Sequence, residues 1–292
     1  MSANDDSSAI RVRHHAVDGN NGGRGPIGEI TIDRPERFNS LDVRTAQDLR
    51  KAGLQLARDP DVRVIVLRGS HGVFCSGADL RYIREGGEPD DLGYLTPGVR
   101  DVPSGYGEVF RQILEYLHST IAELRRAPKP VIAAVDGVVA AGGLGLALAC
   151  DIVVASRRAT FEYAYAKTAL CGAEGVTFLL PKLVGLRRAL DMALLARRLH
   201  AREALEAGLI SEVFDDDAFD REVDALAARM AAGPTGAYAS LKQLMNEALG
   251  IDRLDYHLDR EVEALAASAD SADFAEGLDA FFGKRRARFG TG

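Results

Sequence analysis

The segment Val73-Phe74-Cys75-Ser76-Gly77-Ala78-Asp79-Leu80 decides the fold, together with a second glycine-rich segment at residues 137–151. Each follows an apolar run that predicts a buried strand, at residues 64–67 and 131–135, and each runs into a helical pattern. A strand that breaks at glycine and continues as a helix leaves free backbone N–H groups at the turn. Two such turns side by side can direct two N–H donors at one oxygen. They therefore predict an oxyanion hole, which suits chemistry that builds negative charge on a carbonyl.

The composition excludes several classes of protein. A net charge of −7 over 292 residues argues against nucleic-acid binding, and a hydrophobic fraction of 47% is ample for a core. No apolar run approaches the length of a membrane span, so no membrane interaction is expected. Three cysteines without metal-ligand or redox spacing, and no signal-peptide pattern, predict a reducing, cytoplasmic location. Cys75 beside the first turn is either a small buried hydrophobe or a nucleophile.

The chain alternates strands and helices until about residue 177, after which helices dominate. This order predicts an α/β fold of stacked βα units followed by a helical tail. Residues 1–9 are expected to be disordered, and residues 86–105 are expected to form a mobile loop over the site. Strands are predicted at residues 10–17, 27–32, 62–67, 130–135, 152–155 and 159–161, and helices at 40–58, capped by Ser40 or Asp42, at 106–126 and from 142.

The two glycine segments resemble those of the crotonase (enoyl-CoA hydratase/isomerase) superfamily. Three further segments add to the resemblance in the family's order, at residues 31–41, 128–137 and 280–285. It covers roughly residues 10 to 288. It implies an acyl-CoA thioester substrate and an enolate-type intermediate, with coenzyme A as part of the substrate, no separate cofactor and no metal.

The resemblance also implies the architecture. The family fold is an α/β, crotonase-like spiral of ββα units with a C-terminal helical trimerisation region. On this chain the spiral core with the acyl-CoA site would occupy residues 10–200, and the C-terminal helical region residues 201–292. A homotrimer or hexamer is the expected assembly.

By the same resemblance, Ala78 and Gly142 carry the two oxyanion N–H donors. The residues fit this role, because both lie at strand-to-helix turns and both have minimal side chains. A helix that begins at Gly142 would add a favourable dipole. The alternative is that the glycines only permit tight turns. Asp79 is expected to cap the following helix rather than to take part in chemistry.

Two departures from the family pattern bear on the reaction. A typical hydratase of this family has two catalytic glutamates, and this chain has Gly145 and Tyr165 at those positions. Adding water across a double bond uses one carboxylate to act on the water and another to deliver a proton. Hydration by the usual mechanism is therefore not expected.

A carboxylate follows at Glu174, in a glycine-rich turn where isomerases and dehalogenases of the superfamily place an acid. Their acid usually matches Ala173, one residue earlier. Glu174 is thus either a catalytic acid–base group or a cap for the helix from Val176.

His118 is the other catalytic candidate, because it matches a base of the superfamily's aromatic acyl-CoA dehalogenases; a packed helix histidine is the alternative. Tyr163 and Tyr165 are expected to line the acyl pocket, or only to pack. Glu162 is a spare carboxylate close to the site in sequence.

The remaining family contacts are peripheral. Arg34, Phe38 and Leu41 match positions where coenzyme A approaches the N-terminal turn. Phe281 and Lys284 match C-terminal positions that reach coenzyme A, with Lys284 as a partner for the 3′-phosphate. Ordinary surface or packing roles are the alternative for each.

Three hypotheses remain open at this level. The leading one is an enzyme that stabilises a thioester enolate at Ala78 and Gly142 and moves a double bond with Glu174 as the single base. The second is hydration with rearranged acids, or an aryl-acyl-CoA dehalogenase or hydrolase reaction that uses His118. The third is a CoA-binding scaffold subunit without catalytic acids.

Overall fold

Two β-sheets form the centre of the computed structural model, which describes residues 8–16, 25–88, 91 and 105–290. The larger sheet has the strand order β1-β2-β3-β5-β7-β10, and only the β1–β2 pair is antiparallel. Its strands are β1 (Ile10–His15), β2 (Ile27–Ile32), β3 (Val64–Gly69), β5 (Val131–Val135), β7 (Ile152–Ser156) and β10 (Glu212–Phe214).

The smaller sheet has the order β4-β6-β8-β9, with β9 antiparallel to β8. Its strands are β4 (Val73–Cys75), β6 (Val138–Ala140), β8 (Thr160–Glu162) and β9 (Arg198–His200). The chain passes from the larger sheet to the smaller one three times, as β3–β4, β5–β6 and β7–β8, and a helix follows each passage. This is the predicted α/β spiral of ββα units.

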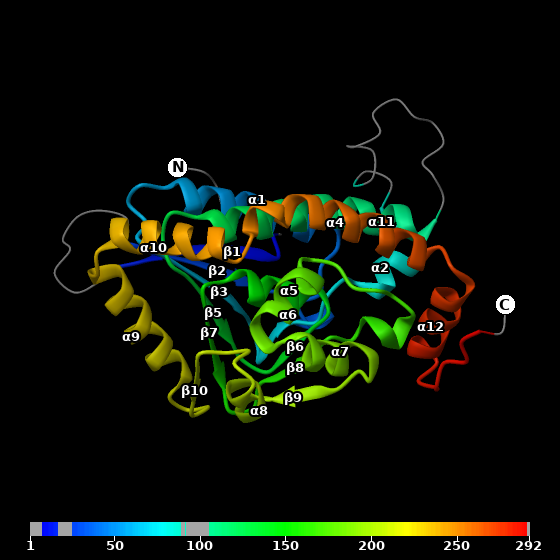
Figure 1. Cartoon of the computed structure of the whole chain (residues 1–292). Coiled ribbons are helices and arrows are strands. Elements are labelled where there is room, and N and C mark those ends of the chain that lie inside the picture. Colours follow the sequence, from blue (N-terminus) through cyan, green and yellow to red (C-terminus); the bar gives the residue numbers. More distant parts are fainter. Residues whose placement is uncertain (1–7, 17–24, 89–90, 92–104, 291–292) are drawn as a thin grey trace.

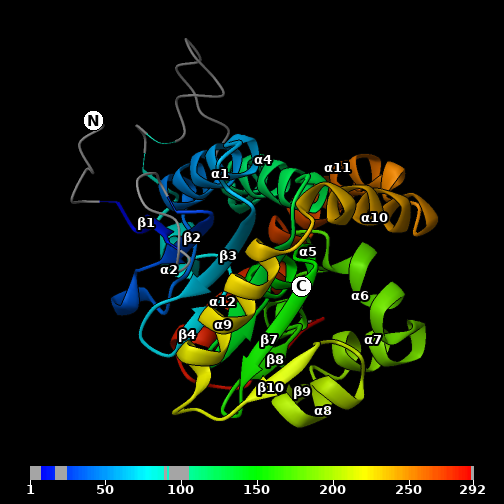
Figure 2. The same ribbon diagram turned by 90° about the vertical axis from the view of Figure 1, so that its left-hand side faces the viewer.

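Helices cover both faces of the larger sheet (Figures 1 and 2). The helices that precede the C-terminal region are α1 (Val43–Arg58), α2 (Leu80–Arg84), α4 (Tyr106–Arg126), α5 (Gly142–Ala149), α6 (Val176–Val184) and α7 (Leu186–Leu194). Those of the C-terminal region are α8 (Ala201–Glu206), α9 (Phe219–Ala232), α10 (Thr235–Ala248), α11 (Leu254–Ala269) and α12 (Ala272–Phe282). Short 3₁₀ turns are η1 (Pro35–Arg37), η2 (Tyr165–Thr168) and η3 (Ile251–Arg253).

The sheet's alternating side chains build two cores, because successive strand residues face opposite sides. Ile65 and Leu67 of β3 join the main core with α1, α4 and α5. Val64 and Val66 face the other way and pack with Phe219 and Val223 of α9 in a smaller core. The central strands are therefore apolar on both faces, as the unbroken hydrophobic runs of the sequence predicted.

The helices predicted near the site agree with the structure, whereas β4 and β6, which lie between the predicted strands and the glycine turns, were not predicted. Helix α1 is capped by Asp42, whose side chain accepts a hydrogen bond from the Thr45 N–H, so Asp42 and not Ser40 is the cap. Helix α4 has the predicted bounds, and α5 begins at Gly142. The first strand ends at His15, two residues earlier than expected. The expected disordered start and most of the expected loop at 86–105 lie outside the described residues.

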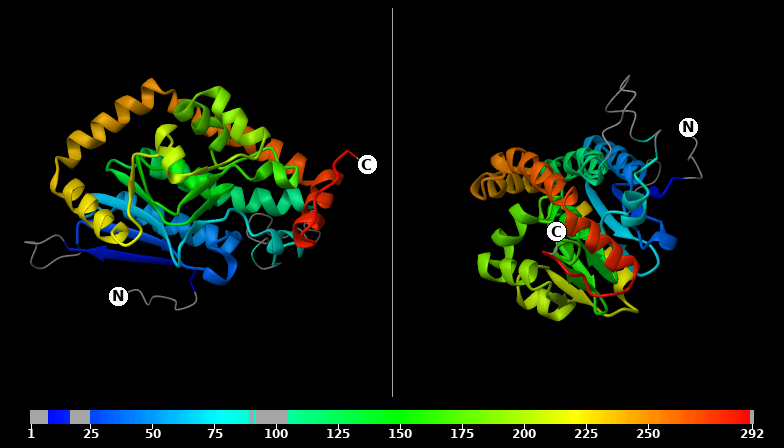
Figure 3. Two further views of the ribbon diagram at one scale, coloured as in Figure 1. Left: turned by 90° about the horizontal axis from the view of Figure 1, so that it is seen from below. Right: turned by 90° about the vertical axis from the view of Figure 1, so that its right-hand side faces the viewer.

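The C-terminal region contains more than helices. Strand β10 (Glu212–Phe214) pairs with β7, so the larger sheet continues past the residue-200 boundary predicted for the spiral core. Helix α12 lies at one end of the molecule and α9 and α10 at the other (Figure 3). Among the helices of the described residues, none combines the length and apolarity needed to cross a bilayer.

Candidate active site

Strand pairing brings the two glycine turns together. In the smaller sheet Val73 of β4 lies opposite Val138 of β6, and Cys75 lies opposite Val139. The turns that follow these strands therefore lie at the same sheet edge. Gly77 has φ +96°, and a Cβ built there would lie 2.8 Å from Ala141 Cβ and 3.2 Å from the Gly142 nitrogen. Only glycine allows the two turns to approach so closely.

The two predicted oxyanion donors are available at this edge. Among the described residues, the backbone N–H groups of Ala78 and Gly142 have no hydrogen-bond acceptor, whereas the Leu41 N–H donates to Gly77 O and the Asp79 N–H donates to Leu41 O. Gly142 is the first residue of α5, where the helix dipole favours negative charge. Ala141 before it has φ +47° and ψ −121°, a strained conformation for a residue with a Cβ.

Glu174 lies directly against the second turn. Its side chain is buried, and a methyl group built on Gly142 would lie 2.8 Å from Glu174 Oε1. The Tyr165 hydroxyl donates a hydrogen bond to the other carboxylate oxygen, Oε2. One carboxylate oxygen is therefore held by tyrosine, while the other faces the oxyanion turn.

The position of Glu174 explains Gly145. A Cβ at residue 145 would overlap the carbonyl oxygen of Glu174 and lie 2.6 Å from its Cβ. The space that a side chain would take at residue 145 of α5 is therefore occupied by the backbone of the Glu174 turn. The glycine at residue 145 and the position of the acid at residue 174 are therefore linked, because the turn that carries Glu174 leaves no room for a side chain at residue 145.

Burial controls the proton affinity of Glu174. The pKa of Glu174 is raised from 4.5 to about 8, because burial and, to a smaller extent, the charge of Glu261 outweigh the lowering effect of the Tyr165 hydrogen bond. A carboxyl group with a pKa near neutrality can both accept and return a proton. Glu174 does not cap α6: the cap position is Gly175, and no side chain of the local sequence caps that helix.

His118 lies behind Glu174 rather than in front of it. The Glu174 N–H donates to His118 Nε2 at 3.1 Å, so this nitrogen is an acceptor and carries no proton. Burial, with a smaller contribution from His257, lowers the pKa of His118 to about 3. The imidazole is neutral and does not line the cavity. This geometry argues against its prediction as a base acting on substrate.

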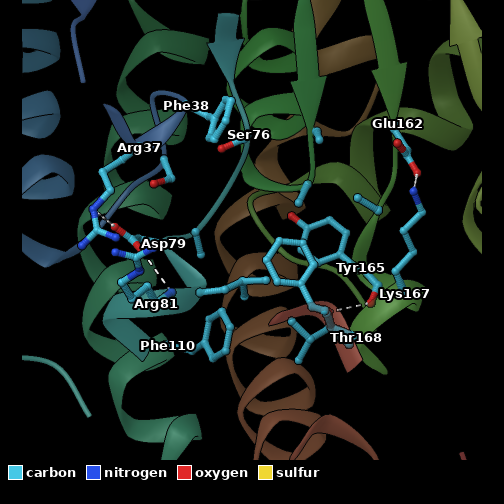
Figure 4. A pocket seen from close by; sticks show the side chains of 18 of the residues that line it. Arg37, Phe38, Ser76, Asp79, Arg81, Phe110, Glu162, Tyr165, Lys167 and Thr168 are labelled. Atoms are coloured by element: carbon cyan, nitrogen blue, oxygen red, sulfur yellow. Dashed lines mark hydrogen bonds and ion pairs between the residues drawn. The ribbon is translucent and has the colours of Figure 1, made fainter. Parts of the chain in front are cut away.

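A cavity of about 400 Å³ opens beside Ala78 and Glu174. Figure 4 shows the aromatic rings of Tyr165 and Phe110 pointing into it from different elements. Charged side chains stand on either side: Arg37, Asp79 and Arg81 on one, and Glu162 and Lys167 on the other. Leu80, Leu170 and Phe282 add to the apolar lining. The cavity thus joins an apolar interior to charged walls beside the candidate acid.

Several predicted contacts line this cavity and others do not. Tyr165, Phe38 and Phe281 line it, and Phe38 and Phe281 are largely exposed there. Lys284 lies in an adjoining hollow that shares Lys167 and Phe281 with the cavity. The predicted coenzyme A contacts at the C-terminus are therefore near the opening.

Arg34, Leu41 and Tyr163, for which substrate contacts were predicted, are not among the residues that line the cavity. The Arg34 guanidinium pairs with Asp42 and Asp79, which ties the first turn to α1. The Leu41 side chain is fully buried in the core. The Tyr163 hydroxyl donates to Cys171 O at 2.7 Å, and its ring packs edge-on against Tyr165 at 5.0 Å.

The other candidates have structural partners. Asp79 caps α2, as predicted, by accepting from the N–H groups of Arg81 and Tyr82. Glu162 lines the cavity but pairs with Lys167 and Arg198, and these partners hold its pKa below its usual value against the effect of burial. Burial raises the pKa of the Cys75 thiol to about 12, which does not suit a nucleophile.

Sequence reasoning missed Arg37, Arg81 and Lys167 in the cavity wall. Arg37 lies within the segment 31–41, Arg81 follows the segment 73–80, and Lys167 lies two residues after Tyr165 on η2. Their only signal was therefore proximity in sequence to residues already singled out. Among the described residues, no group of three or more His, Cys, Asp or Glu side chains could hold a metal ion.

Comparison with known proteins adds a family assignment. The family model described as enoyl-CoA hydratase/isomerase matches residues 22–98 and 109–292. The 1,2-epoxyphenylacetyl-CoA isomerase of Escherichia coli is 36% identical over 89% of this chain and 93% of its own length. The 4-chlorobenzoyl coenzyme A dehalogenase-2 of an Arthrobacter species is 32% identical over 97% of this chain and 94% of its own.

The solved structure of an enoyl-CoA hydratase from Mycobacterium avium subsp. paratuberculosis aligns with a TM-score of 0.81 and 32% identity. The alignment covers 97% of this chain and 98% of that one. The similar proteins therefore carry the names of an isomerase, a dehalogenase and a hydratase on one fold.

Proposed function

This chain belongs to the enoyl-CoA hydratase/isomerase family, and we propose that within it the chain moves a double bond in an enoyl-CoA thioester. The observation that carries the proposal is the buried carboxylate of Glu174, held by Tyr165 and lying against the oxyanion turn at Gly142. It is a single acid–base group beside a pair of free N–H donors.

The reaction needs one base. With a 3-enoyl-CoA, the Glu174 carboxylate takes a proton from C2, and the electron pair of that C–H bond moves into the thioester enolate. The N–H groups of Ala78 and Gly142 donate to the enolate oxygen, each contributing about 3 kcal/mol of transition-state stabilisation. The carboxylic acid then returns the proton to C4 and gives the 2-enoyl-CoA. No atom is gained or lost.

The alternatives have less support. Hydration through the usual pair of glutamates is not expected, because Gly145 leaves no carboxylate there and Glu162 is paired with two cations. A dehalogenase-like reaction through His118 is disfavoured, because its Nε2 is occupied by the Glu174 N–H behind the cavity. The isomerase name of the E. coli relative is consistent with the proposal.

Coenzyme A would enter past the exposed rings of Phe38 and Phe281, toward the basic hollow that contains Lys284. The acyl group would reach the apolar part of the cavity at Phe110 and Tyr165. CoA thioesters should therefore bind far better than the corresponding free acids.

The test is to incubate a panel of 2- and 3-enoyl-CoA esters in heavy water and to follow deuterium uptake and double-bond position. Wild type should exchange protons or isomerise at least one ester, and should hydrate crotonyl-CoA slowly or not at all. Glu174→Gln should lower the rate by about 10²–10⁴, as expected for loss of a positioned acid–base group. Glu162→Gln, which removes another carboxylate of the cavity wall, should have a much smaller effect.

Rapid hydration of crotonyl-CoA by wild type would contradict the proposal. If Glu174→Gln kept full activity and His118→Ala lost it, the isomerase proposal would give way to a dehalogenase-like or hydrolytic reaction that uses His118. An absence of any turnover or exchange across the panel, with thioester binding retained, would favour a CoA-binding scaffold.

A further inference from the structure

The turn that carries Glu174 has an unusual backbone. Glu174 has φ +54° and Gly175 has φ +71°, so two consecutive residues are in the left-handed region before α6 begins at Val176. A residue with a Cβ is strained there by about 1–2 kcal/mol. Such a conformation persists only where surrounding groups hold it.

The N–H groups of this turn are held mainly from distant elements. The Val176 N–H donates to Ala173 O within the turn, and the Glu174 N–H donates to His118 of α4. The N–H groups of Gly175 and Thr177 both donate to the carboxylate of Glu261, at 2.7 and 3.2 Å. Glu261 lies on α11, so a side chain from 84–86 residues further along the chain caps α6.

Glu261 is buried and finds its hydrogen-bond donors in this turn. The Thr177 hydroxyl donates a third hydrogen bond to Oε1. Two histidines lie nearby, with His118 Nε2 and His257 Nε2 each 3.7 Å from a carboxylate oxygen. His118 Nε2 is already an acceptor for the Glu174 N–H, so it cannot donate to Glu261. The carboxylate is therefore directed at residues 175–177.

We propose that Glu261 is a positioning residue for Glu174: from α11 it fixes the turn at residues 173–177, and thereby holds the Glu174 carboxylate against Gly142. The inference rests on the proposed role of Glu174 as the proton-transfer group. Glu261 is not among the residues that line the cavity, so it is not placed to contact substrate. It acts through the backbone that carries Glu174.

The charge of Glu261 offers a second way to test the proposal, through the pKa of Glu174. It is one of the causes that raise the pKa of Glu174, so its removal should lower that pKa. Burial raises the pKa of Glu261 itself, while hydrogen bonds from Thr177 and Gly175 oppose this. Besides burial, the charge of Glu174 or Glu261 raises the pKa of Tyr165, Tyr163, Cys75 and Cys171, and His118 and His257 each lie 3.7 Å from Glu261.

The experiment compares Glu261→Gln with Glu263→Gln on the full-length protein. Gln keeps an acceptor for one N–H group but loses the charge and the second acceptor. The control removes an exposed carboxylate of the same helix, which pairs with Arg111. With the enoyl-CoA that wild type turns over best, Glu261→Gln should lower kcat about 10–100-fold, as expected for a shift of about 1 Å in a catalytic group.

The KM of Glu261→Gln should stay within about threefold of wild type, because the cavity lining is unchanged. The acidic limb of its pH–kcat/KM profile should move to lower pH, while Glu263→Gln keeps the wild-type profile and kcat. A melting curve measured on each variant separates loss of kcat from loss of folded protein.

A measurement without substrate keeps the proposal falsifiable. In protein labelled with ¹³C at glutamate Cδ, the Glu174 resonance is the one absent from Glu174→Gln. Its titration midpoint should fall in Glu261→Gln and stay in Glu263→Gln. Unchanged kcat and an unmoved midpoint in Glu261→Gln would overturn the inference. If Glu174→Gln itself keeps full activity, the proposed function fails instead.

Discussion

Glu174 combines a strained backbone with a buried carboxyl group, and both features oppose folding. Its pKa is about 8 in the folded protein against 4.5 in an ordinary environment. Between these two pH values the folded state holds a proton that the unfolded chain releases. The contribution of Glu174 to the free energy of unfolding therefore falls as pH rises through this window.

Glu174→Gln should accordingly be more stable than wild type at pH 8, although its activity should be lower. The gain at pH 8 is at most about 4 kcal/mol, at about 1.4 kcal/mol per pKa unit. Thermal or urea unfolding at pH 5 and pH 8 measures it. The difference between variant and wild type should widen at pH 8, and an equal difference at both pH values would show that Glu174 has an ordinary pKa.

Tyr165 and Glu261 have opposite effects on the pKa of Glu174. Its hydroxyl donates to Glu174 Oε2 and lowers the pKa of Glu174. Tyr165→Phe removes a hydrogen bond to a charged group, worth about 1.5–3 kcal/mol, and should raise that pKa by roughly one to two units. The acidic limb of the pH–rate profile should move to higher pH. Tyr163→Phe, whose hydroxyl bonds Cys171 O, is the matched control and should leave the limb in place.

Sequence reasoning located the two glycine turns better than the contacts around them. Ala78 and Gly142 follow paired strands that were not predicted, but glycine after an apolar run is a local signal of a turn. The direction of a side chain has no such signal. Arg34 matched a coenzyme A contact but pairs with carboxylates at residues 42 and 79, and these pairings depend on tertiary structure. The same limit applies to His118, whose acceptor role depends on a turn 56 residues away.

At the scale of elements, α5 and the Glu174 turn are closely fitted. Gly145→Ala should disturb both, because its Cβ would overlap the carbonyl oxygen of Glu174. We expect a loss of about 1–3 kcal/mol in stability, as for overpacking, and a fall in kcat. Gly236→Ala in α10 is the control, since a Cβ there meets nothing within 4 Å and alanine favours a helix by about 1 kcal/mol.

Calorimetric melting and the exchange assay report on both glycine variants. If Gly145→Ala kept the stability and the kcat of wild type, the Glu174 turn would be able to move away from α5. That result would also weaken the placement of the carboxylate against Gly142.

Element bounds were predictable where a cap or a glycine marks them. Asp42 begins α1 and Gly142 begins α5, both through local chemistry. The start of α6 at Val176 was expected, but its cap was not predictable, because the cap is Glu261 on α11. Strands β4, β6, β9 and β10 were not predicted, since runs of three residues carry little pattern.

On the scale of the whole molecule, one side is formed by α6, α7, α10 and α11 in both end-on views (Figures 2 and 3). It presents apolar side chains: Leu186, Leu190 and Leu194 of α7 are 64%, 45% and 73% exposed. They recur every four residues and so lie along one face of the helix. Leu241, Leu244 and Met245 of α10 are also exposed.

We expect this side to be covered by other copies of the chain in a trimer or hexamer. Light scattering at micromolar concentration should give three or six times the 31.4 kDa chain mass. Leu190→Glu and Leu244→Glu should each shift the protein toward monomer, while Lys51→Glu on the exposed face of α1 should not. A monomeric wild type would exclude the assembly that the family resemblance implies.

The close contact between Gly145 and Glu174 also limits which substitutions the site can accept. A glutamate introduced at residue 145 would meet the backbone of the 174 turn before any benefit from a second carboxylate could arise. Conversely, a side chain at residue 145 would require a different path for the 174 turn. A site with a carboxylate at both residues therefore requires a remodelled turn as well as the substitution at residue 145.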